Sequence, residues 1–387
     1  MEVKQIASII NDVTKETIGD SVVVAEDLSN IVDVGVALEN IDDDNKYKNY
    51  LTGLVDRIGK TIFVNRKYSG SAPSVLISAW EFGSIMQKVR GELPDAEENE
   101  SWELEDGASY DENIYTGVKV SAKFWNKRVT FEVPLSITDD QLKSAFINGE
   151  EMNGFIEMLY NNVDKTLQVK VDDLVMRTIN NMIGETIYDE YGSGSQTASS
   201  GVRAVNLLYL YNQQYGASLT AQQAILTPAF IRFACYTIKL YSARLTKISK
   251  LFNVGQTDKF TPKEYQHLVM LSEFKAGADV FLQSETFHEE FTKLPEAEEV
   301  PFWQGSGTDY KLSSVGKVDI KTASGHDITC TGVLAVMFDR DALGVCNYKR
   351  KVTSKYVAKV EFTNLWYKHF AGYYNDLDEN FVVFFIA

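Results

Sequence analysis

The longest regular pattern of apolar positions in the chain lies between Thr138 and Tyr188. Thr138 and Gln141 are spaced as a capping box, in which each side chain bonds the other's free backbone N–H. After Asn148-Gly149, where a break is expected, apolar residues recur every three or four positions with no intervening proline, as on one face of a helix. They are Met152, Phe155, Ile156, Leu159, Val163, Leu167, Val171, Leu174, Val175, Ile179, Met182 and Ile183.

This spacing predicts one helix from Glu150 to Tyr188, on the order of 55–60 Å long at about 1.5 Å per residue. The alternative is two shorter helices broken at Asn161-Asn162, because asparagine side chains compete for backbone hydrogen bonds. A single long helix would serve as a spine along which other elements pack.

A two-residue alternation precedes this helix. Val118, Val120 and Phe124 alternate with Lys119, Ser121 and Lys123, which is the period of a half-exposed strand. Val129, Phe131 and Val133 continue the pattern, and Pro134 is expected to end it. Before it, residues 92–112 contain Glu92, Asp95, Glu97, Glu98, Glu100, Glu103, Glu105, Asp106, Asp111 and Glu112, with no Lys or Arg.

These two segments predict a long two-stranded projection with one acidic and one basic limb. Because an isolated hairpin is only marginally stable in water, such a projection needs a partner surface. A solvated acidic loop beside an ordinary edge strand explains the same pattern equally well.

The remaining chain alternates between helix and strand patterns. The Gly- and Ser-rich residues 191–201 predict a loop and a lobe boundary. Thr227-Pro228 begins a helix whose apolar stripe continues to Asn253, and a short buried strand at His267–Leu271 leads to another helix from Ser272.

The last part of the chain is rich in strands. The segments 318–320 and 328–330 alternate around Ser324-Gly325, which predicts a hairpin. Val333–Phe338 is continuously apolar and is expected to be buried on both faces. Phe381–Ala387 is an apolar strand that would aggregate if exposed, so it must lie inside a sheet or be covered.

Composition narrows the function. With 387 residues, 44% apolar and 24% charged, the chain is a folded protein of two or three lobes. The net charge of −16 argues against a surface that binds nucleic acid through its phosphates. No signal peptide and no run of about 18 apolar residues is present, so we expect a cytoplasmic product with no membrane span.

No residue pattern predicts a catalytic, cofactor-binding or metal-binding site. Cys235, Cys330 and Cys346 are an odd set with no CxxC pair, and are expected to be reduced core residues. The four histidines lack ligand spacing, and His288-Glu289-Glu290 is not an HExxH motif. We therefore expect that the protein is not an enzyme.

The order of these parts resembles the major capsid proteins of tailed bacteriophages, which have the Hong Kong 97-type fold. The C-terminal sequence from Asn380 to Phe385 is also similar to the C-termini of capsid proteins from small phages of Gram-positive bacteria. The expected source is a podophage-like virus. The resemblance implies an α+β fold with an N-terminal arm, an extended β-hairpin loop, a spine-helix peripheral domain and an axial domain. The implied parts are 1–60 (arm), 61–137 (extended loop and flanking strands), 138–200 (peripheral domain with spine helix), 201–330 (axial domain) and 331–387 (return to the peripheral domain and C-terminal strand).

The resemblance also implies a function. Such a protein self-assembles into pentamers and hexamers of an icosahedral head that encloses double-stranded DNA without sequence-specific binding. It would be assembled in the host bacterial cytoplasm, reside in the virion capsid, and need a portal protein. A scaffolding protein would be separate, because the region before the extended loop is too short to hold one.

Two other functions remain open on the sequence. An encapsulin-like nanocompartment shell would share the fold, with a protein cargo. A soluble acidic hydrolase using paired carboxylates is disfavoured, because its carboxylates lie in a run rather than as an isolated pair.

The opposed charges of the two limbs suggest where subunits meet, because charge complementarity sets register between partners. The residues expected at the inter-subunit contact are Glu97, Glu98, Glu100, Trp102, Lys119, Lys123, Trp125, Lys127 and Arg128.

Overall fold

A computed structural model describes residues 3–17, 23–27, 29–30, 32–33, 36, 72–77, 86–91, 117, 119–125, 128–138, 140–141, 149–192, 194–283, 297–304, 311–322, 324–357, 359–360 and 362–387. The chain forms two compact units, each described by itself. Unit 1 comprises Met1–Trp80, Arg128–Met176 and Val345–Gly372, and unit 2 comprises Glu81–Lys127, Arg177–Gly344 and Tyr373–Ala387.

Unit 1 is built on a four-stranded sheet with the order β1-β11-β12-β4. Its strands are β1 (Leu76–Ile77), β11 (Leu343–Val357), β12 (Phe362–Asn375) and β4 (Arg128–Thr138), and α1 (Val3–Thr17) and a 3₁₀ turn (Pro73–Val75) also belong to it. Strand β1 pairs parallel with β11, and β4 pairs antiparallel with β12. The core of the unit lies where the apolar stripe of α5 (Gly149–Tyr191) meets the sheet, and its buried side chains are Ile137, Val163, Leu167, Leu365 and Tyr367.

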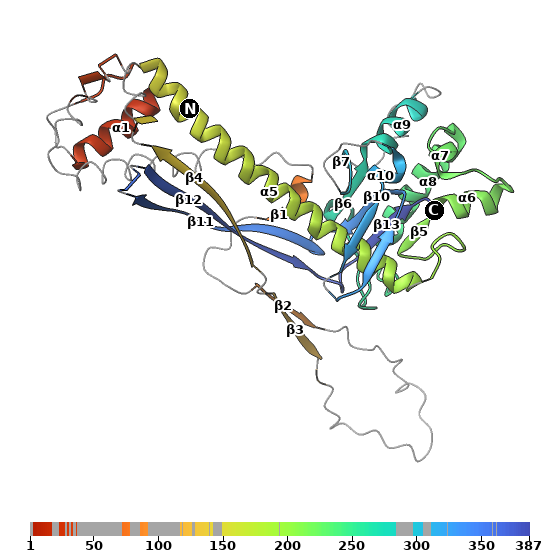
Figure 1. Cartoon of the computed structure of the whole chain (residues 1–387). Helices are drawn as coiled ribbons and strands as arrows, with labels where there is room; N and C mark the ends of the chain where they lie inside the picture. The colour runs from red at the N-terminus through yellow and green to blue at the C-terminus, as the bar shows by residue number, and fades with distance from the viewer. Residues whose placement is uncertain are drawn as a thin grey trace. The chain divides into compact units, whose positions relative to one another are not determined.

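The spine is one helix. Helix α5 extends over 43 residues without a break at Asn161-Asn162, so the single-helix prediction is confirmed and the two-helix alternative is wrong (Figure 1). The apolar stripe outweighs the local preference of the two asparagines. The expected capping box also forms, since Thr138 N donates to Gln141 Oε1 at 3.2 Å and Gln141 N donates to Thr138 Oγ1 at 3.3 Å.

Strand β4 corrects the expectation that Pro134 ends the strand. The strand continues to Thr138, and Pro134 lies opposite Trp366 of β12. Among the strands described, β4 is at the edge of its sheet, with a neighbour on one side only. An edge position tolerates proline, because no second strand needs its missing N–H.

Unit 2 contains a five-stranded sheet with the order β5-β13-β10-β6-β7. Strand β13 (Phe381–Phe385) lies between β5 (Ala204–Asn206), to which it is parallel, and the antiparallel β10 (Val333–Asp339). Beyond β10 follow β6 (Gln266–Leu271) and β7 (Ala297–Val300). Both β10 and β13 are buried along their whole length, which confirms the prediction for the C-terminal strand.

The remaining elements of unit 2 between β5 and β10 in the chain include the helices that lie around this sheet (Figure 1). They are α6 (Leu207–Tyr215), α7 (Ala221–Ala224), α8 (Pro228–Leu245), a 3₁₀ turn (Lys263–Tyr265), α9 (Ser272–Gln283), α10 (Leu312–Val315), β8 (Val318–Lys321) and β9 (Asp327–Cys330). Strands β8 and β9 form the predicted hairpin, with Gly325 at a φ of 93° in its turn. Cys235, Cys330 and Cys346 are free and buried, as expected of core thiols.

Helix α8 begins at the predicted Thr227-Pro228 but ends earlier than its stripe suggests. It stops at Leu245, whose carbonyl accepts a hydrogen bond from Thr261 N at 2.7 Å. A bridge between Ser249 and Lys259 then replaces helical bonding. Ile248, which continues the apolar period, is 57% exposed instead of buried.

The division of the chain into five parts stays a prediction. Fewer than half of the residues of the arm are described, and 37–71 lie outside the described residues. Among the described helices, none is long and apolar enough to cross a membrane.

Candidate functional site

The turn between β12 and β13 gathers three carboxylates, those of Asp376, Asp378 and Glu379. The backbone fixes the turn, because Asp376 N donates to Ala342 O at 2.7 Å and Asp378 N donates to Asp376 Oδ1 at 3.2 Å. The side chains of Asp376 and Glu379 are only 2% and 6% exposed. Carboxylates held out of water in this way require cationic partners.

A two-stranded hairpin supplies three of these partners. Strands β2 (Met86–Gly91) and β3 (Val120–Trp125) pair antiparallel, with Lys88 opposite Lys123. Because side chains alternate across a strand, Lys88, Arg90 and Lys123 share one face of the hairpin.

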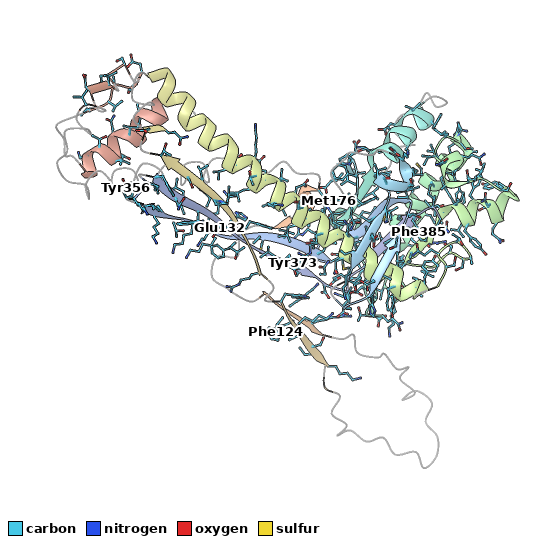
Figure 2. All side chains as sticks on the ribbon, in the orientation of Figure 1. Phe124, Glu132, Met176, Tyr356, Tyr373 and Phe385 are labelled. Carbon is cyan, nitrogen blue, oxygen red and sulfur yellow. The ribbon has the colours of Figure 1, made fainter. Side chains whose placement is uncertain are left out.

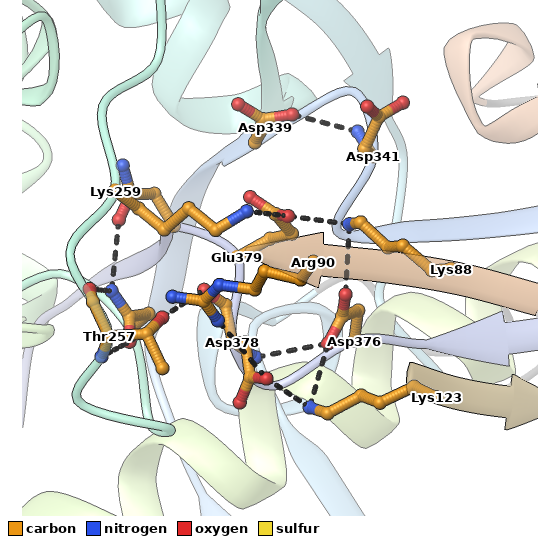
Figure 3. Close-up of polar contacts among 12 residues, drawn as sticks. Lys88, Arg90, Lys123, Thr257, Lys259, Asp339, Asp341, Asp376, Asp378 and Glu379 are labelled. Atoms are coloured by element: carbon orange, nitrogen blue, oxygen red, sulfur yellow. Dashed lines mark hydrogen bonds and ion pairs between the residues drawn. The ribbon is translucent and has the colours of Figure 1, made fainter. Parts of the chain in front are cut away.

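Each of these cations meets the acidic turn (Figure 3). Lys88 Nζ contacts Asp376 Oδ2 at 2.9 Å and Glu379 Oε1 at 2.5 Å. Lys123 Nζ contacts Asp376 Oδ1 at 3.1 Å and Asp378 Oδ2 at 2.5 Å. Arg90 contacts Asp378 at 3.3 Å.

A fourth cation comes from the loop after α8. Lys259 Nζ also donates to Glu379 Oε1, and the Thr257 hydroxyl donates to Asp378 O at 2.9 Å. We call the set of Lys88, Arg90, Lys123 and Lys259 with Asp376, Asp378 and Glu379 the anchor. It has four positive and three negative groups within unit 2.

The electrostatics of the anchor keep its central groups charged. Burial opposes ionisation of Asp376, but Lys88 and Lys123 outweigh it and hold the pKa of this carboxyl below its ordinary value. Burial would likewise lower the pKa of Lys88, yet Glu379 and Asp376 raise it. Trp125 strengthens the attachment, since its Nε1 donates to Asn375 O at 3.2 Å and its ring packs on Tyr374 at 5.5 Å between centroids.

The opposite face of the hairpin is apolar and open to solvent. Val89, Val120 and Phe124 are 61%, 64% and 61% exposed, and Phe124 projects from β3 in Figure 2. The register places all three on the face that does not carry the anchoring lysines. Three large apolar side chains on one small ribbon make a surface of the kind that partners cover.

This arrangement corrects two expectations from the sequence. The apolar side of the half-exposed strand was expected to be buried, but it is exposed, and the lysine side turns to the protein because buried carboxylates lie there. The strand paired with β3 is not the acidic run but Met86–Gly91, which carries Lys88 and Arg90 and is itself basic. The acidic residues of 92–112 lie outside the described residues.

The expected contact residues are distributed as follows. Lys123 and Trp125 are brought together in the anchor region, in contacts with their own chain. Lys119 is exposed, and Arg128 begins β4 with its side chain exposed. Glu97, Glu98, Glu100, Trp102 and Lys127 lie outside the described residues. For all nine, a role between subunits stays a prediction.

The sequence reasoning missed the acidic turn and Lys259. A signal for the turn was present, since Asp376, Asp378 and Glu379 directly precede a strand that had to be buried. Its partners lie 120 to 291 positions earlier in the chain, so no local pattern could pair them.

Comparison with known proteins decides what this architecture belongs to. A family model of Phi29-like phage major capsid proteins matches residues 6–385, nearly the whole chain. The chain belongs to the Phi29-like phage major capsid protein family.

Solved structures support this assignment at the level of the fold. The chain is similar to one in the capsid structure of Staphylococcus phage Andhra, with 10% identity, a TM-score of 0.50, and 81% of this chain and 83% of that chain covered. It is also similar to one in the structure of the head fiber and inner core protein gp22 of native bacteriophage P68, with 8% identity, a TM-score of 0.51, and 84% and 86% covered. No curated protein sequence matches significantly.

This phage major capsid protein is thus a structural component of a virion capsid, whose copies build the shell. The interpretation as a non-enzymatic structural protein is confirmed, and the acidic hydrolase is wrong. The family also favours the phage capsid over the nanocompartment shell.

Proposed function

We propose that this major capsid protein forms pentamers and hexamers of an icosahedral head around double-stranded DNA. The β2–β3 hairpin is held to its own subunit by the anchor and lays its open apolar face on a neighbouring copy. Assembly takes place in the bacterial cytoplasm, with a portal protein at one vertex and a separate scaffolding protein.

The observation that carries this proposal is the two-sided character of the hairpin. One face is fixed by ion pairs to buried carboxylates, and the other presents Val89, Val120 and Phe124 to solvent. Burying one such side chain fully stabilises an interface by about 1.5–3 kcal/mol. Repeated at every subunit contact of a closed shell, this gain would favour assembly.

The proposal changes which part of the hairpin meets the neighbour. The charge of Lys123 is paired with Asp376 and Asp378 within the subunit, so the apolar face is the better candidate for the lateral contact. We call the paired strands β2 and β3 the stem. Of the residues expected from the sequence, Lys119 and those of the acidic run remain candidates for contacts beyond it.

The enclosed DNA is not expected to adhere to the shell. With a net charge of −16, the subunit repels phosphates overall and gains little from the release of their condensed counterions. Purified subunits should therefore show only weak DNA binding. Tight binding that weakens steeply with salt would contradict this part of the proposal.

The experiment is expression of the full chain, with and without its scaffolding protein, followed by negative-stain electron microscopy. The wild type is expected to form closed shells, and the double variant Val120→Ser/Phe124→Ser is expected to remain a folded, unassembled subunit. Leu226→Ser is the control, because Leu226 is even more exposed, at 75%, but lies far from the hairpin in the chain. Normal shells from the double variant would refute the role of the apolar face.

A further inference from the structure

A cavity of about 100 Å³ lies within unit 2, where the end of β3 meets the end of β12. The C-terminal part of α5 and the turn between β8 and β9 complete its walls. One water molecule needs only about 10–15 Å³ of such space, so the cavity has room for a group of several heavy atoms.

A buried carboxylate lines this cavity. Asn181 and Glu185 are four residues apart on α5, so they share one face of the helix, and both contribute to the wall. Glu185 is only 6% exposed, and its Oε1 accepts a hydrogen bond from Ser324 N at 3.0 Å. Within the described part of the chain, this is the one polar contact of the carboxylate, and no Lys, Arg or His side chain pairs with it. A carboxylate so far from water needs a cation.

The cations described nearby have other partners. Lys88 and Lys123 contact Asp376, in the anchor. His326, two residues after the turn residue that bonds Glu185, stacks on Tyr188 at 3.6 Å between ring centroids. The cation that Glu185 needs is therefore not among the described residues.

Aromatic rings form another part of the wall. Trp125, Tyr373 and Tyr374 all line the cavity. The rings of Trp125 and Tyr374 lie 5.5 Å apart between centroids and are inclined by 49°, so they form a corner and not a parallel stack. The faces of such rings attract a cation that lies within about 6 Å. A carboxylate beside aromatic rings is therefore suited to an organic cation.

A metal ion is a poorer match for this cavity. Ca²⁺ takes about 6–8 oxygen ligands and Mg²⁺ requires a nearly ideal octahedron, whereas aromatic rings offer no ligand oxygen. An ammonium group donates hydrogen bonds to a carboxylate, and its alkyl chain packs against the rings. We propose that the cavity binds an alkylammonium group, with Glu185 as its counter-ion and Trp125, Tyr373 and Tyr374 as its aromatic walls.

This site goes beyond the proposed function and does not depend on it. Its lining belongs to one subunit and is separate from the apolar face of the hairpin. Binding can therefore be measured on full-length, unassembled subunits, and its outcome stands whether or not shells form.

The first test is a titration of wild-type subunits, ¹⁵N-labelled at tryptophan, with n-butylammonium or with its neutral counterpart 1-butanol at constant ionic strength. The indole N–H signal of Trp125, assigned from Trp125→Phe, should shift with n-butylammonium. The affinity for 1-butanol should be about tenfold lower or less, because it lacks the charge. Equal affinity for the two compounds, or no shift of the Trp125 signal, would overturn the proposal.

The second test uses variants of the cavity wall. Glu185→Gln keeps an oxygen for Ser324 N but removes the charge, so the affinity for n-butylammonium should fall by about tenfold or more. Tyr373→Leu should weaken binding several-fold without touching the carboxylate. Glu264→Gln is the matched control, since it removes one exposed charge elsewhere in unit 2. The indole signal of the buried Trp303 reports that each variant is folded, and unchanged affinity in a folded Glu185→Gln or Tyr373→Leu would overturn the proposal.

Two further ligands distinguish the sources of the ammonium group. The compound 1,4-diaminobutane represents a free polyamine, and Nα-acetyl-lysine methylamide represents a lysine side chain of a partner protein; the tighter binder identifies the source. Lys127 follows Trp125 by two positions, so the chain's own lysine is tested with Lys127→Gln. Binding of n-butylammonium to the wild type supports the proposal, whereas binding to Lys127→Gln alone would show that the chain fills its own cavity and would overturn it.

Discussion

Replacing Asp376 with asparagine is expected to loosen the β2–β3 hairpin from its own subunit. Asparagine keeps the shape of the side chain and its bond from Asp378 N, but removes the charge that Lys88 and Lys123 share. Removing one partner from a buried ion pair costs about 3–5 kcal/mol. Because the side chains of Lys88 and Lys123 are 25% and 42% exposed, their hydration offsets part of this cost. We therefore expect the attachment of the hairpin to weaken by about 2–3 kcal/mol.

Hydrogen exchange of the backbone amides of β2 and β3 in unassembled subunits measures this loss directly. At about 1.4 kcal/mol per tenfold, protection of the stem should fall by roughly 30- to 150-fold, while the amides of β10 and β13 keep theirs. Asp341→Asn is the control, because the Asp341 side chain lies near the anchor (Figure 3) but is exposed and lies 3.9 Å from Arg340. Unchanged protection of the stem in Asp376→Asn would refute the anchor.

Three further predictions concern pH and packing. Because the pKa of Asp376 is below its ordinary value, its contribution to hairpin attachment is present above the unfolded pKa and is lost as the pH falls through the folded one. The protection factors of the β2 and β3 amides, corrected for the intrinsic exchange rate at each pH, should therefore fall as the pH drops below about 4, and Asp376→Asn should weaken this dependence. Burial, aided by Arg350, lowers the pKa of His369 to about 4, so as the pH falls the unfolded chain takes up this proton before the folded one and the free energy of unfolding decreases. Urea unfolding should show a loss of about 2 kcal/mol from pH 7 to pH 5, and His369→Gln should remove this loss. Gly332 has a φ of 70° and an added Cβ would lie 2.1 Å from Ile386 O, so Gly332→Ala should cost at least about 3 kcal/mol in the same assay. Gly154→Ala, with nothing within 4 Å of the added Cβ, should instead stabilise by about 0.5–1 kcal/mol, and a similar result for the two glycines would contradict the packing argument.

The elements predicted correctly were those whose evidence lies within a few neighbouring residues. Local patterns were enough to predict the long helix α5 from its apolar stripe, the buried strand β10 from its continuous apolar run, and the hairpin turn from Ser324-Gly325. The burial of β13 was predicted because an exposed strand of this composition would aggregate. The order of these elements carried the resemblance to phage capsid proteins, so the fold class could be inferred from the sequence.

The errors have one physical cause, which is that they depend on distant partners. Pro134 breaks a strand only if both of its sides are paired, and its edge position is not visible locally. The partner of β3 was expected to be the acidic run, but it is β2, which carries Lys88 and Arg90. The lysines of the hairpin face the protein because Asp376 and Glu379, far along the chain, lie buried beneath them.

The central claim is that the open face of the hairpin is completed by another copy of the chain. A cryo-electron microscopy reconstruction of assembled shells, at a resolution that shows side chains, tests it most directly. The account predicts Val89, Val120 and Phe124 buried against a neighbouring subunit, with Lys88 still paired to Asp376 of its own chain. Shells in which these three side chains face solvent, or in which the lysines pair with another subunit instead, would contradict it.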